Sequence, residues 1–223
     1  MNSTGTYIIA EAGVNHNKNV DTAIALADAA KETGADVVKY QLELPNVRTP
    51  YTLTWDEQLV VYEHCKKIGM PFACTAFDVR TLYFLVQNTK LEFIKIASCD
   101  ATNTGLIKEA EKCNIPIIQS VKRDARIVSF GAPRKILHVV AEYPTPPEHS
   151  DLKRVTEPGI SGISDHSGNI AIPIAAAALG AKIIECHITF DRNQPGPDHR
   201  SSLTVREFRK MVKSVRDIEK ALA

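Results

Sequence analysis

The sequence predicts an α/β fold of the (β/α)₈ class, a TIM barrel that is small and has at least one shortened helix. Three observations support this prediction. Short apolar runs alternate with helical patterns, which indicates βαβ units and a parallel sheet. Eight such runs can be counted, which is the number of strands that closes the barrel. Several runs also end in polar side chains, as expected where functional residues gather at the carboxyl end of parallel strands.

The strand-like runs are short and rich in aliphatic and β-branched residues. Continuous apolar runs of this kind are typical of parallel strands that are buried on both faces. We therefore expect them to form the wall of the barrel. The eight runs comprise residues 7–14, 37–41, 71–77, 93–98, 115–121, 135–140, 161–167 and 181–188.

Helical patterns follow most of these runs. The first ends at Gly34, which is a suitable C-cap, and the last begins at Thr204, which is a suitable N-cap. The connection formed by residues 122–134 leaves little room for a full helix, so the shortened helix is expected there. The predicted helices comprise residues 21–33, 55–68, 79–88, 104–113, 169–179 and 204–222.

The composition suits one α/β domain over residues 1–223, because 44% of the 223 residues are hydrophobic and can form a sizeable core. Lys and Arg number 27 against 26 for Asp and Glu, so the net charge is +1. This balance provides no electrostatic reason to expect nucleic acid or a membrane surface as a partner. An anionic ligand would have to be attracted by a local site.

The cysteines and the amino terminus indicate a cytoplasmic location. Five cysteines are scattered without a C-x-x-C spacing, which favours free thiols in a reducing compartment. Residues 1–6 do not resemble a secretory signal, and no apolar run reaches the roughly 18 residues that a membrane-spanning helix needs.

Two histidines at strand ends are the candidate metal ligands. Residues two apart in a strand share a face, so Ser164 should point with His166, and Glu185 with His187. Neighbouring strands lie about 4.8 Å apart, so the two imidazoles could bind one divalent ion such as Mn²⁺, Co²⁺, Zn²⁺ or Fe²⁺. The alternative is that each is a hydrogen-bonded core histidine.

Lys39 and Lys95 interrupt apolar strands, and a buried ammonium group needs a counter-charge. Both could bind an anionic ligand, since lysine serves phosphate as a point charge. The alternative is structural ion pairing with Glu11 or Asp100. Nearby strand ends also carry hydroxyl groups that could complete an anion pocket, at Thr75, Ser98, Ser120 and Ser164.

Three further side chains could serve such a site. Glu11 lies inside the first strand, where it could orient a substrate hydroxyl, act as a base or neutralise a lysine. The stiff segment at residues 195–199 could present Asp198, and the proline-rich segment at residues 143–147 could present the Tyr143 hydroxyl. Alone, the segment at residues 195–199 would be only a turn.

Taken in order, the motifs resemble the sialic acid synthase family, which includes N-acetylneuraminate synthase and its legionaminate, pseudaminate and spore-coat relatives. The resemblance spans about residues 7 to 214. It rests on the segments Ile9–Asn17, Lys39–Gln41, Lys95–Ser98, Tyr143–Pro146, Gly162–Gly168, Gly180–His187 and Pro195–His199.

The resemblance implies a (β/α)₈ enzyme that condenses phosphoenolpyruvate with an N-acyl hexosamine, such as N-acetylmannosamine. The products are a nine-carbon 2-keto acid and phosphate. It implies that His166 and His187 hold a divalent metal, for which Mn²⁺ is expected and Mg²⁺ or Co²⁺ are alternatives. It assigns phosphoenolpyruvate to Lys39, Thr75, Lys95, Ser98, Ser120 and Ser164. It places Glu11, Asp100, Tyr143 and Asp198 near the sugar as the catalytic set.

The sequence also departs from the family pattern. Members usually continue into an antifreeze-like domain that lends an arginine to the sugar site of the partner subunit, whereas this sequence stops at Ala223. We therefore expect one domain and weak recognition of the N-acyl group of the sugar. We also expect either a homodimer or a separate partner domain. Ala141 stands where the family often has an asparagine. Two alternatives remain: a different aldehyde acceptor, or a catalytically weakened barrel that binds a ligand or a partner.

Overall fold

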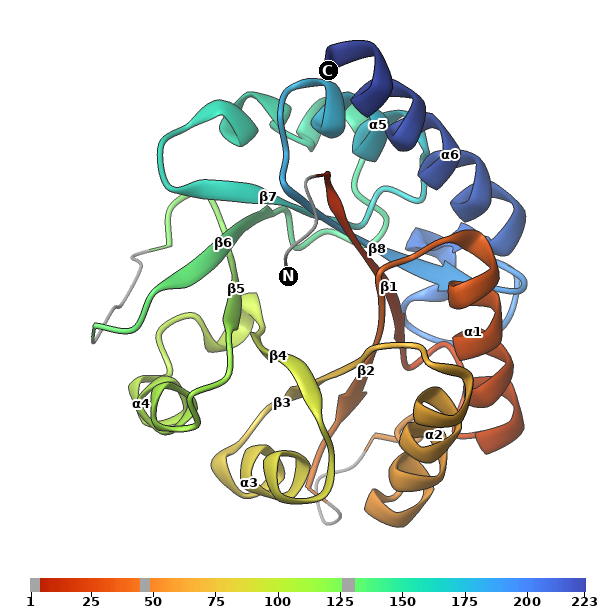
Figure 1. Ribbon diagram of the computed structural model, residues 1–223, viewed down its shortest axis with the longest axis vertical. Coiled ribbons are helices and arrows are strands. Elements are labelled where there is room, and N and C mark those ends of the chain that lie inside the picture. The colour runs from red at the N-terminus through yellow and green to blue at the C-terminus, as the bar shows by residue number, and fades with distance from the viewer. Residues whose placement is uncertain (1–4, 45–48, 126–130) are drawn as a thin grey trace.

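The computed structural model describes residues 5–44, 49–125 and 131–223. Eight parallel strands follow one another around a closed barrel, since β1 pairs with both β2 and β8 (Figure 1). The predicted (β/α)₈ class is therefore confirmed, and the strands agree with the predicted runs to within two residues at each end. The strands are β1 Tyr7–Gly13, β2 Val37–Leu42, β3 Phe72–Ala76, β4 Leu91–Ile96, β5 Ile117–Val121, β6 Arg134–Val139, β7 Ile160–Asp165 and β8 Ile183–Thr189, with a short β9 Leu203–Thr204 beside β8.

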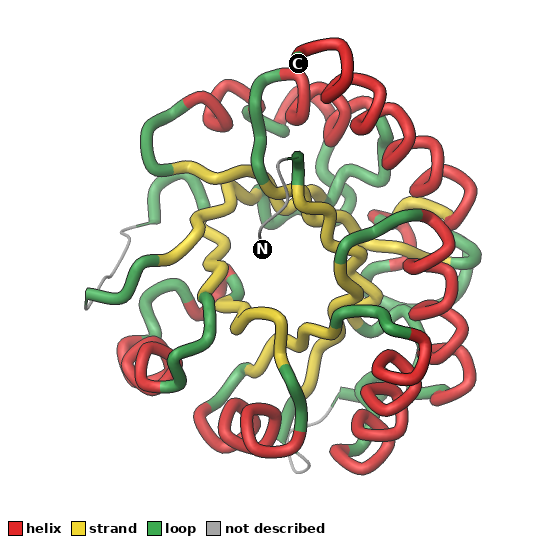
Figure 2. The backbone as a smooth tube through the Cα atoms, viewed as in Figure 1, coloured by secondary structure: helices red, strands yellow, loops and turns green. Residues whose placement is uncertain are grey.

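Helices form an outer ring around these strands (Figure 2). The described parts of the connection between β5 and β6 contain no helix, as the short sequence there predicts; residues 126–130 lie outside the described residues. Two short 3₁₀ helices, η2 Pro147–His149 and η3 Leu152–Thr156, connect β6 to β7. The α-helices are α1 Val20–Thr33, α2 Trp55–Ile68, α3 Val79–Asn88, α4 Thr104–Lys112, α5 Ala171–Ala178 and α6 Val205–Leu222.

The helix ends show why these segments are helical. Gly34 closes α1 with a left-handed backbone, φ 84°, a conformation that glycine adopts without a steric penalty. Thr54 and Glu57 form a capping box at the start of α2, and Thr204 and Glu207 form another at the start of α6. The predicted caps Gly34 and Thr204 are therefore confirmed. None of the helices in the described residues is long and apolar enough to cross a membrane.

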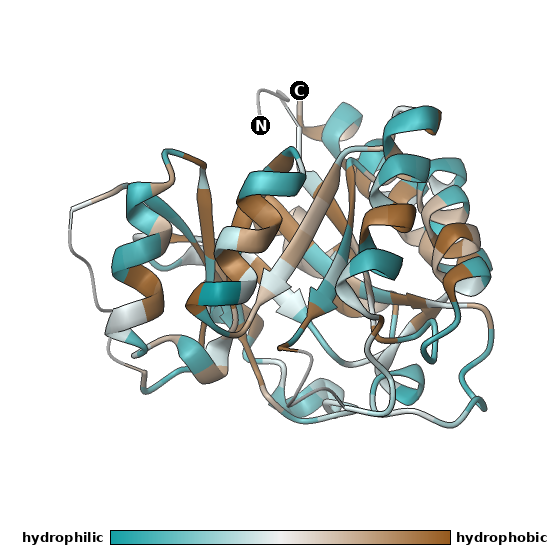
Figure 3. Ribbon diagram, turned by 90° about the horizontal axis from the view of Figure 1, so that it is seen from below, coloured by the Kyte–Doolittle hydropathy of each residue, from teal (hydrophilic) through white to brown (hydrophobic). Residues whose placement is uncertain are grey.

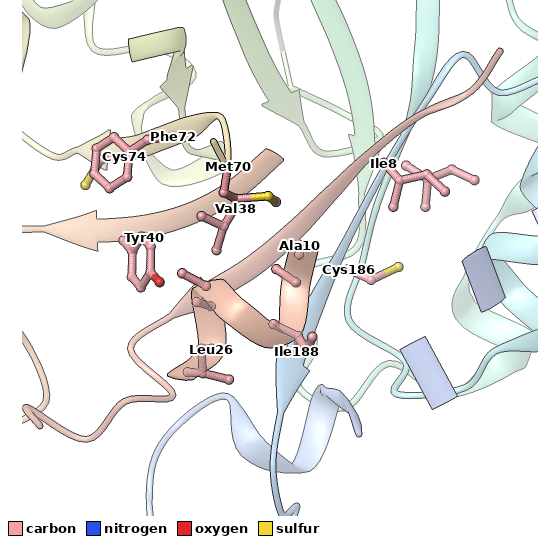
Figure 4. Close-up of a cluster of buried hydrophobic side chains, with 14 of the residues drawn as sticks. Ile8, Ala10, Leu26, Val38, Tyr40, Met70, Phe72, Cys74, Cys186 and Ile188 are labelled. Atoms are coloured by element: carbon pink, nitrogen blue, oxygen red, sulfur yellow. The ribbon is translucent and has the colours of Figure 1, made fainter. Parts of the chain in front are cut away.

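The outer apolar layer lies between the strands and the helices, where brown strands meet the brown inner faces of helices whose outer faces are teal (Figure 3). Figure 4 shows the part of this layer around α1, in which Ile8, Ala10 and Leu26 pack with Val38 and Ile188. Because the side-chain period of a strand is two, Ile9 between Ile8 and Ala10 points into the barrel instead.

The inner apolar layer fills the barrel and ends where inward-facing polar residues begin. Because alternate strand residues share a face, the residue two positions after each inner apolar residue also points inward, toward the carboxyl end. The inner layer consists of Tyr7, Ile9, Val37, Ala73, Phe93, Ile118, Leu137 and Ile183. Two positions further along the strands lie Glu11, Lys39, Thr75, Lys95, Ser120, Val139 and Glu185, which line one cavity.

Gly162 allows β7 to approach β8 within the barrel wall. A Cβ atom built on Gly162 would lie 1.8 Å from the backbone oxygen of Ile183, its register partner on β8. We expect Gly162→Ala to lower the free energy of unfolding by about 3 kcal/mol or more, because the clash is with backbone. Urea unfolding would measure this. Gly105→Ala in α4 is the control, since its Cβ would meet nothing closer than 3.6 Å; an equal loss in both variants would contradict the explanation.

Candidate active site

A cavity of about 320 Å³ lies at the carboxyl end of the barrel. It is lined by all of the site residues predicted from the sequence except Asp100. Asp100 lies at the end of the short helix η1 Ser98–Asp100, where it accepts a hydrogen bond from Asn103 Nδ2 at 3.0 Å. The predicted residues that line the cavity are Glu11, Lys39, Thr75, Lys95, Ser98, Ser120, Tyr143, Ser164, His166, His187 and Asp198.

The two lysines are joined by buried carboxylates into one network. Lys39 Nζ lies 2.8 Å from Glu11 Oε2 and 3.7 Å from Glu185 Oε2, and it donates a hydrogen bond to Thr75 Oγ1 at 3.0 Å. Lys95 Nζ lies 3.1 Å from Glu185 Oε1. The side chains of both lysines and both glutamates are at most 5% exposed. The structural ion pair anticipated with Glu11 is therefore present, whereas Glu185, rather than Asp100, is the carboxylate that links the lysines.

The network determines which groups are charged. Burial by itself favours a neutral Glu185, but Lys39 and Lys95, together with the Ser164 hydroxyl at 2.8 Å, hold the pKa of its carboxyl at about 2. Burial also lowers the pKa of Lys95, which Glu185 offsets only in part. For Lys39, Glu11 and Glu185 together outweigh burial and raise the pKa. Each buried lysine therefore has a glutamate beside it on the cavity floor, and the lysines favour the ionised form of Glu185.

His166 and His187 face the same cavity from neighbouring strands, and their ring centroids lie 5.4 Å apart. His166 Nδ1 lies 2.9 Å from Val140 O, so Nδ1 carries the proton. Nε2 of His166 is then an acceptor, and the Tyr143 hydroxyl lies 3.2 Å from it. The ring of Tyr143 also stacks on that of His166, with 4.1 Å between centroids.

The histidine pair suits a metal ion in its donor chemistry. Burial, reinforced by His187, lowers the pKa of His166 to about 3, and the neutral imidazole is the form that ligates metals. In the described part of the chain, His187 Nδ1 is buried and has no hydrogen-bond partner, and Asp198 Oδ2 lies 3.8 Å from it. Within the described ranges, no cluster of three or more His, Cys, Asp or Glu side chains is arranged to hold a metal. The residues therefore fit an open site with two nitrogen donors, and not a closed cage.

Sequence reasoning missed two polar side chains that line the cavity, Gln41 and Lys122, and it gave no role to Glu185, which it placed on the same face as His187. The signal that could have found Gln41 and Lys122 is the two-residue period of the strands. Gln41 lies two positions after Lys39, and Lys122 lies two positions after Ser120. Gln41 Nε2 donates to Glu11 Oε1 at 2.9 Å, so it orients the carboxylate that holds Lys39.

The chain is similar in sequence to a known family and to several named synthases. Residues 43–223 match the model of the NeuB family. The chain is 33% identical to N,N'-diacetyllegionaminic acid synthase of Campylobacter jejuni, covering 97% of this chain and 77% of that protein. It is also 33% identical to N-acetylneuraminate-9-phosphate synthase of Drosophila melanogaster, covering 94% of this chain and 67% of that protein.

A solved structure has the same architecture. The crystal structure of N-acetylneuraminic acid synthetase from Leptospira borgpetersenii, in complex with citrate, superposes with a TM-score of 0.88 at 30% identity. The match covers 99% of this chain and 86% of that one. Together with the family model and the two synthases, this match shows that the chain belongs to the NeuB family of sialic-acid-type synthases.

Proposed function

We propose that this chain catalyses a metal-dependent condensation of phosphoenolpyruvate with an N-acyl hexosamine such as N-acetylmannosamine. The observation that carries the proposal is the convergence of two lysines and two histidines on one cavity at the carboxyl end of the barrel. Membership of the NeuB family supports the same reaction class. The five free cysteine thiols support a reducing, cytoplasmic setting for it.

The proposed reaction forms one carbon–carbon bond and releases phosphate. The methylene carbon of phosphoenolpyruvate attacks the aldehyde carbon of the open-chain sugar, and the aldehyde oxygen takes up a proton to become a hydroxyl. Water adds to the second carbon of the former enol, and phosphate leaves, so that a nine-carbon 2-keto acid results. Holding both substrates in attack geometry provides much of the rate enhancement of such a reaction.

The metal would be held by His166 and His187, with Mn²⁺ expected and Mg²⁺ or Co²⁺ as alternatives. When bound, such an ion supplies a Lewis acid that polarises the acceptor carbonyl. Val140 O keeps the proton of His166 on Nδ1, so Nε2 is available as a ligand once Tyr143 moves from it. Asp198 lies beside His187, where its carboxylate could accept a hydrogen bond from the acceptor sugar.

The other residues of the chain bind and orient the substrates in this proposal. Lys39, Thr75, Lys95, Ser98, Ser120 and Ser164 surround phosphoenolpyruvate, and Glu11, Tyr143 and Asp198 face the sugar. An incoming carboxylate or phosphate would take over some of the lysine contacts that Glu11 and Glu185 make in this structure. Since Asp100 does not line the cavity, it is not part of this proposed set.

Lys39→Met and Lys95→Met should each weaken phosphoenolpyruvate binding. Methionine keeps much of the length of the side chain but removes its charge, and losing a charge-assisted contact costs about 1.5–3 kcal/mol, roughly 10- to 150-fold in affinity. Calorimetric titration with phosphoenolpyruvate would measure the effect. Lys66→Met on the exposed surface of α2 is the control. Affinity equal to the wild type in both variants would leave the two lysines with a structural role only.

The purified chain, assayed with Mn²⁺, phosphoenolpyruvate and a panel of hexosamines, tests the proposed function. We expect release of inorganic phosphate and formation of a 2-keto acid in equal amounts, and only when an aldehyde acceptor is present. N-acetylmannosamine, mannose and their 6-phosphates would identify the preferred acceptor. Phosphate release at the same rate without any acceptor would indicate that the chain hydrolyses phosphoenolpyruvate instead of condensing it with a sugar. Binding of phosphoenolpyruvate without turnover would indicate a ligand-binding barrel.

A further inference from the structure

Both buried lysines of the cavity floor already lie against carboxylates. Lys39 and Lys95 are each in contact with a buried glutamate, and Asp198 adds a third carboxylate to the lining. A further cation beside these two lysines would therefore favour the binding of a dianionic phosphate group. A third lysine, Lys122, also lines the cavity.

Lys122 follows β5 directly and lies two positions after Ser120, so both side chains belong to the inward face. Lys122 is exposed, and no ion pair of its ammonium group is found within the described part of the chain. Ser120 is 2% exposed, and its Oγ has no hydrogen-bond partner among the residues that the structure describes. A buried hydroxyl is seldom left without a partner, so Ser120 Oγ indicates a missing ligand atom at this place.

Lys122 also lies where the central cavity meets a second one. This outer cavity, of about 510 Å³, shares Lys122, Val139 and Ala141 with the central cavity. It lies between the residues after β5 and the outer side of β6, where the described residues form no covering helix. Lys122 is therefore one of the residues at which the two cavities adjoin.

We propose that Ser120 and Lys122 together form a receptor for a phosphate group at the junction of the two cavities. The proposal rests on the proposed function, because it assigns one substrate phosphate of that reaction to a place in the cavity. The hydroxyl donates one directed hydrogen bond, and the ammonium group supplies the charge. The phosphate could be that of phosphoenolpyruvate or that of a phosphorylated acceptor sugar, and the two sources share this chemistry.

Binding of inorganic phosphate tests the receptor directly. Calorimetry on the purified chain should show that Lys122→Met binds inorganic phosphate about ten-fold more weakly than the wild type, because a charge-assisted contact is lost. Lys122→Arg should retain binding. Lys135→Met is the matched control, since this exposed lysine near the amino end of β6 undergoes the same charge change away from the cavity. Equal affinity in Lys122→Met and Lys135→Met would overturn the proposal.

Steady-state kinetics then identify the source of the phosphate. A roughly ten-fold rise in the KM for phosphoenolpyruvate in Lys122→Met, with an unchanged KM for the acceptor, would assign the receptor to phosphoenolpyruvate. A rise confined to the KM for a hexosamine 6-phosphate would assign it to the acceptor. If the chain shows no turnover, the proposed reaction is wrong. Phosphate binding by the wild type and its loss in Lys122→Met would still support the proposed phosphate receptor. Ser120→Ala should weaken phosphate binding as well, and unchanged binding would exclude the serine.

Discussion

Replacing His166 or His187 with alanine should abolish tight binding of one Mn²⁺-like ion and most of the activity. The two imidazoles that line this cavity are the expected nitrogen ligands of the metal. One imidazole alone would not hold the ion tightly. Loss of a residue that hydrogen-bonds to a metal ligand typically lowers metal affinity or activity 10- to 100-fold. Loss of the ligand itself should therefore lower metal affinity by more than about 100-fold. Metal titration by calorimetry and the synthase assay would measure the two effects.

Stability should change less than activity in these variants, because both imidazoles line the cavity and are not part of the apolar layers. His64→Ala is a suitable control, since His64 pairs with Asp28 at the surface between α1 and α2 and lies outside the cavity. The control should bind metal like the wild type. If the double variant of His166 and His187 still bound one equivalent with unchanged affinity, the metal would have to lie elsewhere.

Replacing Glu185 with glutamine should cause the largest loss of stability among single changes in the cavity. Glu185 contacts both buried lysines, and glutamine keeps its shape but removes the charge that compensates them. Removing one partner of a buried ion pair costs about 3–5 kcal/mol, because an uncompensated charge stays behind. Glu63→Gln is the matched control: Glu63 pairs with Lys66 at the exposed surface of α2, where such a pair contributes about 0–1 kcal/mol. Urea unfolding of both variants would compare them.

The contribution of Glu185 to the stability of the fold should depend on pH. The pKa of Glu185 is lowered from its ordinary value of 4.5 to about 2 in the folded chain, so folding favours the ionised form. The stabilisation is therefore fully present above about pH 4.5 and is lost as the pH falls toward about 2. The stability difference between the wild type and Glu185→Gln should shrink over this range. A difference that stayed constant from pH 6 to about pH 2 would contradict the assignment of the charge to Glu185.

The position of the polar side chains at the carboxyl end of the barrel could be predicted from the sequence alone. A strand has a side-chain period of two, so an apolar residue at one position and a polar residue two positions later must share a face. Ile9 and Glu11, and Phe93 and Lys95, follow this rule. Since all parallel strands of a barrel end on the same side, the local pattern also determined that these polar groups meet at one end.

The local signals likewise determined the ends of the elements. The caps Gly34 and Thr204 act through bonds within a few residues, so no distant part of the chain is needed to recognise them. The described residues between β5 and β6 form no helix, which agrees with the short stretch of sequence available there.

Only the tertiary structure decided which charges pair. Glu185 comes from β8, whereas its lysine partners come from β2 and β4, and their separation depends on how the barrel closes. Asp100 lies five positions after Lys95 in sequence, yet its short helix keeps it out of the cavity. The junction at Lys122 also depends on the arrangement of two strands and the loops that follow them. The physical reason is that a strand period specifies a direction, while a contact across the barrel requires strands far apart in sequence to be brought together.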